Sequence, residues 1–346
     1  MKAVVLYKQE EGCVDVRDVP EPTIGPNDVL VDIDCAGICG SDIHIYHNEV
    51  SYRLKPPLTL GHEFAGVIAD KGADVQGFSV GDRVTVETAA YVCGRCQFCR
   101  AGDYNVCPER RSYGFTVNGA FTRYVSARQQ ILHHVPANVP LQEAALTEVM
   151  CVAYNALAIK TRVRPGDLVV VLGPGPIGLS CVQVARLLGA GTVVVTGLRH
   201  DRGRLKVARE IGADLIINSD EQDAVRIVQD LSHGIGADVV VEAAGPSAAL
   251  KQALAIVSRH GQITKIGWGP EPVGFSLDPL IEKVVTLQGV FSHTWQTWER
   301  CLELMSQGRL RAAPLISGRM SIEGWREAFA AVEDRSAVKI LLDPRI

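Results

Sequence analysis

The chain lacks the features that mark membrane, secreted and nucleic-acid-binding proteins. Its formal net charge is only −4 over 346 residues, so no charge surplus attracts nucleic acid or an anionic membrane. The opening MKAVVLYKQEEGCVDV has no long apolar run behind a basic end, which argues against a secretory signal. Glycines and prolines break the most apolar region, 168–196, below membrane-spanning length. We therefore expect a cytoplasmic protein with no nucleic-acid or membrane partner.

The residues that are present fit an ordinary globular protein with a metal site. The composition is 47% hydrophobic and 21% charged with 33 glycines, which is typical of a mixed α/β protein, and the length favours two domains. Four of the ten cysteines fall within 93–107, while the other six are scattered. Because cytosolic thiols stay reduced, a tight cluster indicates metal binding rather than disulfide bonds.

The pattern of apolar residues changes near Asp167. Before it, short β-rich runs at 29–34, 66–69 and 82–86 alternate with turn residues. After it come six apolar β-rich runs, at 168–172, 192–196, 215–217, 239–242, 262–266 and 284–290. Helical patterns such as 177–188 and 202–211 separate the first five, which predicts a doubly wound parallel sheet. A helix at 295–306 then leads into shorter elements.

The strongest local motif is Cys93-x2-Cys96-x2-Cys99-x7-Cys107. This spacing lets one loop wrap four thiolates around a tetrahedral ion, and four cysteine ligands leave no position for a substrate. We interpret the motif as a structural zinc site. Four free or disulfide-bonded cysteines and an iron–sulfur cluster are the alternatives.

A second group of candidate ligands is dispersed along the chain. Its fragments are Cys39-Gly-Ser41-Asp42-Ile-His44, then Gly61-His62-Glu63, then Glu148. Alone, each fragment is equally typical of buried filling, a polar turn or a carboxylate at a helix start. Together they supply a thiolate, an imidazole and carboxylates, with room for the exchangeable ligand that a catalytic zinc needs.

These motifs carry a resemblance to a known family. The pattern Gly61-His62-Glu63-x2-Gly66-x5-Gly72-x2-Val75 resembles the zinc signature of the medium-chain alcohol dehydrogenases. The chain is most similar to the branches of sorbitol (polyol) and L-threonine dehydrogenases, in which a glutamate resembling Glu148 replaces a cysteine ligand. The resemblance implies a GroES-like β-rich catalytic domain at 1–155, a Rossmann domain at 156–290 and a segment at 291–346 that returns to the first domain.

The resemblance also implies a mechanism. Zinc held by Cys39 and His62, with Glu63 or Glu148 completing the protein ligands, lowers the pKa of an alcohol hydroxyl, and hydride passes to a nicotinamide. The proton leaves through Ser41 and then His44, while Asp42 orients His62. Glu148 could bind zinc directly, bind it through water, or act as a general acid or base.

The cofactor motif is Gly173-Pro174-Gly175-Pro176-Ile177-Gly178, which follows a predicted strand and opens a predicted helix. In that context the glycines allow a tight turn and close approach of a pyrophosphate to the helix N-terminus, although a turn that merely needs glycine is the alternative. The resemblance adds Ile266, Val290 and Phe291 near the nicotinamide and Lys339 near the phosphates.

The end of the second Rossmann strand favours NADP(H) over NAD(H). NAD-preferring members carry an Asp there, whereas this chain has Gly197, followed by Arg199 and Arg202. Either arginine could pair with a 2′-phosphate, while Asp201 more simply caps a helix start. The alternative is a solvated Arg199 in an enzyme that uses NAD.

The substrate is predicted only as a class. A secondary alcohol of a polyol or sugar derivative, with its ketone, is the preferred small-molecule partner, and L-threonine is the alternative. The Arg-Tyr pair of sorbitol-type enzymes is replaced here by Ser292-His293, which argues against sorbitol itself. Zinc-free quinone or enoyl reductases and a non-enzymatic relative are further alternatives. The related branches imply a homo-oligomer, with a tetramer favoured.

Overall fold

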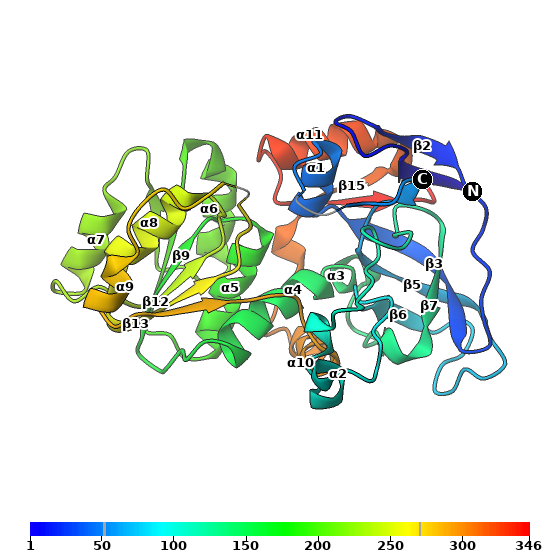
Figure 1. Ribbon diagram of the computed structural model, residues 1–346, viewed down its shortest axis with the longest axis horizontal. Helices are drawn as coiled ribbons and strands as arrows, with labels where there is room; N and C mark the ends of the chain where they lie inside the picture. The colour runs from blue at the N-terminus through cyan, green and yellow to red at the C-terminus, as the bar shows by residue number, and fades with distance from the viewer. Residues whose placement is uncertain (51–52, 270) are drawn as a thin grey trace. The chain divides into compact units, whose positions relative to one another are not determined.

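The computed structural model describes residues 1–50, 53–269 and 271–346, which form two compact units (Figure 1). The first unit comprises Met1–Glu148, His293–Gly308 and Ile316–Ile346, and the second comprises Val149–Ser292 and Arg309–Leu315. The first division thus precedes the expected one at 155, and residues 309–315 join the second unit rather than the first. The division after Glu148 falls inside helix α4 (Thr147–Tyr154), so no loop in the sequence marks it.

The second unit contains a six-stranded parallel sheet. Its strands are β9 (Leu168–Leu172), β10 (Thr192–Gly197), β11 (Leu215–Asn218), β12 (Ala237–Glu242), β13 (Val257–Lys265) and β14 (Thr286–Gly289). They lie in the order β11-β10-β9-β12-β13-β14, and every pairing is parallel. This order confirms the doubly wound Rossmann sheet expected from the alternating sequence pattern.

Helices cover both faces of this sheet. They are α5 (Pro176–Leu187), α6 (Arg202–Glu210), α7 (Ala224–Leu231), α8 (Ser247–Ile256) and the short α9 (Asp278–Glu282). Residues Val170 and Val194 pack in one cluster with α7 and α8, whereas the alternate residues Val169 and Val171 are also fully buried. Strands buried on both faces need the continuous apolar runs that the sequence shows.

The first unit is built on two sheets. Strands β1 (Lys2–Leu6), β2 (Val14–Asp18) and β4 (Leu58–Thr59) form the smaller one. The larger contains β3 (Asp28–Gly37), β5 (Glu63–Lys71), β6 (Arg83–Val86), β7 (Tyr124–Arg128), β8 (Leu132–His134), β15 (Ile316–Ser321) and β16 (Lys339–Asp343). Strand β16 pairs with β3, so the end of the chain completes the sheet that carries the first candidate ligand.

The first unit also contains helices. They are α1 (Gly40–Tyr46), α2 (Gln97–Ala101), α3 (Leu141–Ala144), α10 (Trp295–Ser306) and α11 (Trp325–Glu333). The hydrophobic core of this unit includes Phe64 and Phe121, together with Trp325 and Phe329 of α11. Among the described residues, no helix is long and apolar enough to cross a membrane.

Candidate active site

Three of the dispersed candidate ligands converge in the first unit. Cys39 is the N-cap of α1, just after β3, while His62 precedes β5 and Glu63 begins it. Strands β3 and β5 are antiparallel and pair Gly37 with Glu63, so the sheet register brings the two segments together. One donor atom from each of Cys39, His62 and Glu63 lies within 4.8 Å of the others.

Gly37 makes room for the Glu63 carboxylate. A Cβ atom at position 37 would lie 2.6 Å from Oε2 of Glu63 and 3.2 Å from Cδ2 of Leu146. Both distances are shorter than ordinary van der Waals contact, so a larger residue would displace the carboxylate from the cluster.

Lys339 supplies the counter-charge of Glu63. Its Nζ lies 2.8 Å from the Glu63 carboxylate and donates to the carbonyl of Ile38 at 2.8 Å, and both side chains are almost fully buried. Burial lowers the pKa of Lys339, but the charge of Glu63 outweighs it and the net direction is upward. The structure thus directs this ammonium to Glu63, and its expected contact with cofactor phosphates stays a prediction.

His62 presents an unused ring nitrogen. The residue is 4% exposed, and among the described residues its buried Nδ1 has no hydrogen-bond partner. Burial lowers the pKa of His62, but the Cys39 hydrogen bond and nearby negative charges raise it to about 10. An unpartnered imidazole nitrogen beside a thiol and a carboxylate is the donor set of a zinc site, so these residues fit that ion.

Asp42 forms hydrogen bonds with the backbone around the cluster. Its buried carboxylate accepts from the Cys39 N–H at 2.9 Å and from the Gly61 N–H at 3.3 Å. No hydrogen bond joins it to His62 among the described residues. It therefore fixes the two segments that carry the donors, and the expectation that it orients His62 stays a prediction.

The two residues of the predicted proton path both lie on α1. The Ser41 Oγ is buried and has no hydrogen-bond partner within the part of the chain described. His44 is roughly half exposed, and its Nδ1 lies 3.1 Å from Oε2 of Glu49. The serine thus offers an interior hydroxyl and the histidine a surface imidazole, with no direct bond between them.

Glu148 lies outside the three-donor group and has partners of its own. It stands in the first turn of α4, and its Oε1 is 3.1 Å from Nε2 of His293 and accepts from the Thr88 hydroxyl at 3.4 Å. The Trp298 indole N–H donates to Nδ1 of His293 at 2.7 Å. Burial raises the pKa of Glu148, but the His293 hydrogen bond and the charges of His62 and Lys339 lower it to about 2.

Sequence reasoning missed these partners of Glu148. In the sequence His293 stands out only as a departure from the Arg-Tyr pair, and no motif singles out Thr88 or Trp298. A signal existed in principle, since a buried carboxylate requires hydrogen-bond donors. The sequence does not say which of the many polar residues would reach it.

The four cysteines of the local motif also converge. Their sulfur atoms lie within 4.8 Å of one another, and none of the ten cysteines, all within the described residues, forms a disulfide bond. Backbone N–H groups point at the sulfurs, for example from Cys96 to Cys93 at 3.3 Å and from Cys99 to Cys96 at 3.4 Å. The N–H groups of Arg95 and Cys96 lower the pKa of Cys93 to about 7, which favours a thiolate. This loop fits a structural zinc with four sulfur ligands.

The glycine loop of the second unit fits a pyrophosphate. Gly173 has φ +98°, and a Cβ at Gly178 would lie 2.0 Å from the Gly173 carbonyl oxygen, so both positions need glycine. Gly175 is the N-cap of α5, and a Cβ there would meet nothing within 4 Å, which leaves its backbone open to a ligand. Pro176 opens α5 and has no N–H, so the N–H groups of Ile177 and of the residues after it in the first turn are the ones that can bind an anion.

The other cofactor candidates of this unit lie at the same edge of the sheet. Ile266 follows β13, and Val290 and Phe291 follow β14, at the carboxyl ends where open α/β sheets bind ligands. Ile266 is buried, whereas the Phe291 side chain is 41% exposed. The structure therefore groups these residues with the glycine loop, while Lys339 belongs to the first unit.

The turn after β10 carries the candidates for cofactor specificity. A Cβ at Gly197 would lie 3.0 Å from Cγ of Pro174, so this position packs tightly against the glycine loop. Arg199 is exposed, with its Nε 3.5 Å from Oε1 of Glu221, and Arg202 is an exposed residue at the start of α6. Asp201 accepts from the Leu198 N–H at 3.0 Å, so it caps the preceding short 3₁₀ turn rather than α6 itself.

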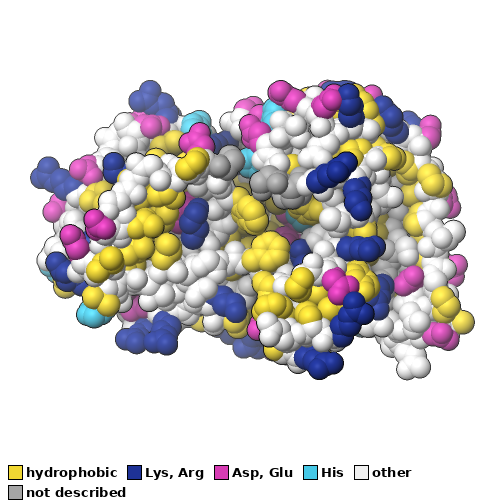
Figure 2. Space-filling view, viewed as in Figure 1, with side chains coloured by type: hydrophobic (Ala, Val, Ile, Leu, Met, Phe, Trp, Pro, Cys, Tyr) yellow, Lys and Arg dark blue, Asp and Glu magenta, His cyan; other side chains and the backbone are white. Residues whose placement is uncertain are grey.

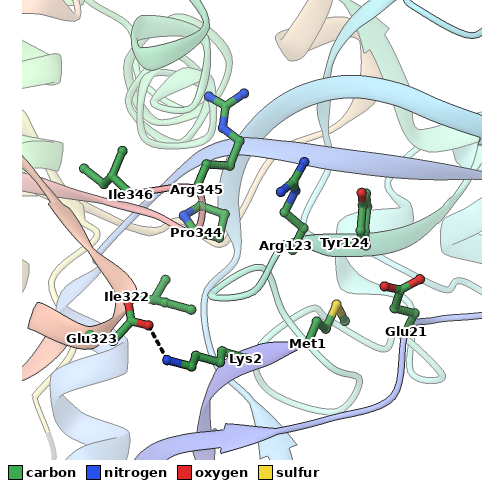
Figure 3. Close-up of a pocket in the computed structure, with 10 residues that line it drawn as sticks. All are labelled: Met1, Lys2, Glu21, Arg123, Tyr124, Ile322, Glu323, Pro344, Arg345 and Ile346. Atoms are coloured by element: carbon green, nitrogen blue, oxygen red, sulfur yellow. Dashed lines mark hydrogen bonds and ion pairs between the residues drawn. The ribbon is translucent and has the colours of Figure 1, made fainter.

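A surface pocket in the first unit, with a volume of about 420 Å³, lies away from this chemistry (Figure 3). It is bordered by an exposed ion pair of 2.8 Å between Lys2 and Glu323. Its lining residues are Met1, Lys2, Glu21, Arg123, Tyr124, Ile322, Glu323, Pro344, Arg345 and Ile346. None of them is a metal-donor candidate, so we do not assign the reaction to it.

Comparison with known proteins agrees with this arrangement. Residues 25–137 match the alcohol dehydrogenase GroES-like domain, and residues 176–307 match the zinc-binding dehydrogenase family. The chain is 42% identical to a sorbitol dehydrogenase from Halalkalibacterium halodurans, with 99% of both chains covered. It is 33% identical to a D-arabitol-phosphate dehydrogenase from Enterococcus avium, over 94% of this chain and 92% of that one.

A solved structure shares the whole fold. The NADP-bound structure of a protein from Sinorhizobium meliloti 1021 superposes with a TM-score of 0.90 at 30% identity, and 99% of each chain is covered. The family match at 25–137 contains both metal-donor clusters, and the match at 176–307 begins at the first residue of α5. The chain is a member of the zinc-binding alcohol dehydrogenase family and an NAD(P)-linked oxidoreductase.

Proposed function

We propose that this protein oxidises a secondary hydroxyl of a polyol or sugar-derived alcohol and reduces the corresponding ketone. The observation that carries the proposal is the convergence of Cys39, His62 and Glu63, with an unpartnered buried nitrogen on His62. Relatives that act on sorbitol and on D-arabitol phosphate support the polyol class.

Cys39, His62 and Glu63 would hold the catalytic zinc, and Cys93, Cys96, Cys99 and Cys107 a second, structural one. A bound zinc would act as a Lewis acid toward the substrate oxygen, and a bound nicotinamide would accept the hydride. Burial raises the pKa of Glu63, and the charge of Lys339 opposes that rise.

The remaining polar groups can transfer the substrate proton and contact the substrate. Ser41 offers a buried hydroxyl that can accept the substrate proton, and His44 can pass a proton to water because its ring is exposed. Glu148 provides a carboxylate beside the cluster with its own set of hydrogen bonds.

Metal analysis and a substrate panel test this assignment together. We expect about two zinc ions per chain, about one in Glu63→Gln, and an unchanged count in Glu148→Gln. The panel would contain polyols, sugar phosphates, L-threonine and simple alcohols, each with both cofactors. No turnover with any polyol or polyol phosphate, or a zinc count unaffected by Glu63→Gln, would contradict the proposal.

We further propose that the enzyme prefers NADP(H). Gly197 carries no carboxylate to repel a 2′-phosphate, and the tight contact with Pro174 resists any larger side chain. Arg199 and Arg202 are both exposed near the end of β10, where the adenosine ribose binds in Rossmann domains. The nearby carboxylate of Glu221 holds Arg199 only weakly, because an exposed pair at 3.5 Å contributes little.

Cofactor kinetics decide this point. The ratio of kcat/KM for NADP to that for NAD should fall by about tenfold or more in Arg199→Ala, as expected for one lost charge-assisted hydrogen bond. Arg226→Ala is the matched control, because Arg226 is an exposed arginine on α7 of the same unit. A wild type that prefers NAD tenfold, or an unchanged ratio in Arg199→Ala, would refute the preference.

We also propose a homo-oligomer, with a tetramer favoured. Among the described residues the edge strand β14 pairs on one side only, and exposed apolar residues lie in it and in the segments before it, including Trp268, Ile281, Val284 and Leu287. Figure 2 displays hydrophobic side chains gathered over the region of α8 and α9. An unprotected edge of this kind invites pairing with another chain. Light scattering at micromolar concentration should give an oligomer that Ile281→Asp weakens, and a monomeric wild type would exclude it.

A further inference from the structure

The imidazole of His293 has hydrogen-bond partners on both ring nitrogens, and its Nε2 also lies 3.5 Å from the Thr88 hydroxyl. Its Nδ1 receives the Trp298 indole N–H at 2.7 Å, and its Nε2 lies 3.1 Å from Oε1 of Glu148. All three residues are buried, with Trp298 at 0% and His293 at 1% exposure. The three side chains therefore form one chain of hydrogen bonds that begins in α10 and ends at the carboxylate of α4.

The chemistry of indole fixes the direction of this chain. An indole nitrogen can only donate, so Nδ1 of His293 must accept and carries no proton. The remaining proton of the neutral ring then sits on Nε2 and points at Glu148. Thr88 adds a second donor to the same carboxylate oxygen at 3.4 Å.

We propose that His293 is a positioning residue for Glu148, and that Trp298 sets its tautomer. This rests on the proposed role of Glu148 beside the reacting centre. Within the described residues, the hydrogen bonds of the Glu148 carboxylate from His293 and Thr88 both fall on Oε1, so the group is fixed by one oxygen. Its Oε2 is thereby left available to the substrate.

The place of the two residues along the chain strengthens this role. Glu148 is the last residue of the first stretch of the first unit, and His293 is the first residue of its second stretch. Their hydrogen bond ties together the two points at which the chain leaves and re-enters that unit. Thr147, the residue before Glu148, also contacts α10, because its hydroxyl donates to the Met305 sulfur at 3.7 Å. The bond from His293 adds a contact that acts on the Glu148 carboxylate itself.

The tautomer can be measured without any substrate. In full-length protein labelled with ¹⁵N-histidine, the signal missing from His293→Gln identifies His293. We expect a protonated Nε2 and an unprotonated Nδ1 in the wild type, and a changed pattern in Trp298→Phe. A proton on Nδ1 of the wild type, or no change in Trp298→Phe, would overturn the assignment.

Kinetics test whether this bond positions Glu148. We expect kcat to fall by about 10- to 100-fold in His293→Leu and by about tenfold in Trp298→Phe, the range seen when a ligand-orienting hydrogen bond is lost, with KM changing far less. His293→Gln keeps a donor for Glu148 and an acceptor for Trp298, so it should recover most of the lost kcat.

Controls separate positioning from folding. Trp295→Phe changes a half-exposed tryptophan of the same helix and should leave kcat and the tautomer unchanged. Equal losses in His293→Gln and His293→Leu, or a kcat of Trp298→Phe equal to the wild type, would overturn the positioning role. A wild type that oxidises no alcohol would refute the proposed function instead, while the tautomer measurement still decides the hydrogen-bond chain.

Discussion

The two candidate metal clusters of the first unit are assembled in different ways. The four cysteines come from one loop of fifteen residues, 93–107, and backbone N–H groups within that loop point at their sulfurs. Cys39, His62 and Glu63 come from two strand ends, and their side chains depend on β3, β5 and β16 for their positions. A local cluster is encoded by spacing, whereas the dispersed one exists only once the sheet has formed.

The surroundings of the two clusters differ as well. Three of the four cysteines are partly exposed, while His62, Glu63 and Lys339 are nearly or fully buried. A buried carboxylate needs a cation or several donors, and Glu63 obtains its cation from a residue 276 positions further along the chain. The dispersed site therefore combines ligand chemistry with a buried ion pair, whereas the cysteine loop depends mainly on its own backbone.

The largest effect on turnover is expected from the dispersed cluster. Cys39→Ala or His62→Ala should reduce kcat by about a thousandfold, or about 4 kcal/mol, because a Lewis acid contributes several kcal/mol to such a reaction. The variants should stay folded by circular dichroism and retain one zinc per chain, on the cysteine loop. Normal turnover in the presence of a chelator would show that this cluster is not the catalytic one.

An intermediate effect, on stability, is expected when Lys339, the counter-charge of Glu63, is removed. Lys339→Met leaves Glu63 buried without its cation, so the free energy of unfolding should fall by about 3 kcal/mol in urea titrations. Lys2→Met is the control, because Lys2 forms an exposed pair with Glu323 and such surface pairs contribute little to stability. Equal losses in the two variants would mean that the Glu63 pair contributes no more than a surface contact.

The smallest effect on the chemical step is expected from the cysteine loop. Cys99→Ser should lower the melting temperature and promote dissociation, because a zinc enclosed by four thiolates contributes to folding directly. Turnover of the folded fraction should change by less than about threefold, well under 1 kcal/mol. A fully stable variant that has selectively lost turnover would reverse the roles of the two clusters.

The fold was predictable where the pattern of apolar residues is regular. The six runs after Asp167 each fall within or overlap one strand of the parallel sheet, and the helix expected at 295–306 is α10 (Trp295–Ser306). Strand ends were less predictable, since β13 begins at Val257 and β14 covers only Thr286–Gly289. Parallel strands are buried on both faces and so leave a continuous apolar signal, whereas their ends depend on neighbouring strands.

The candidate site was likewise predictable only in part. The sequence alone determined which residue types could hold metal and cofactor, because ligand chemistry and glycine loops are written in short motifs. Only the tertiary structure decided that Glu63 joins Cys39 and His62, that Lys339 neutralises it, and that His293 holds Glu148. The partners in the latter two cases lie more than a hundred residues apart in the sequence. Burial rather than sequence spacing selects them, because an ionised group inside a protein needs a partner wherever the fold supplies one.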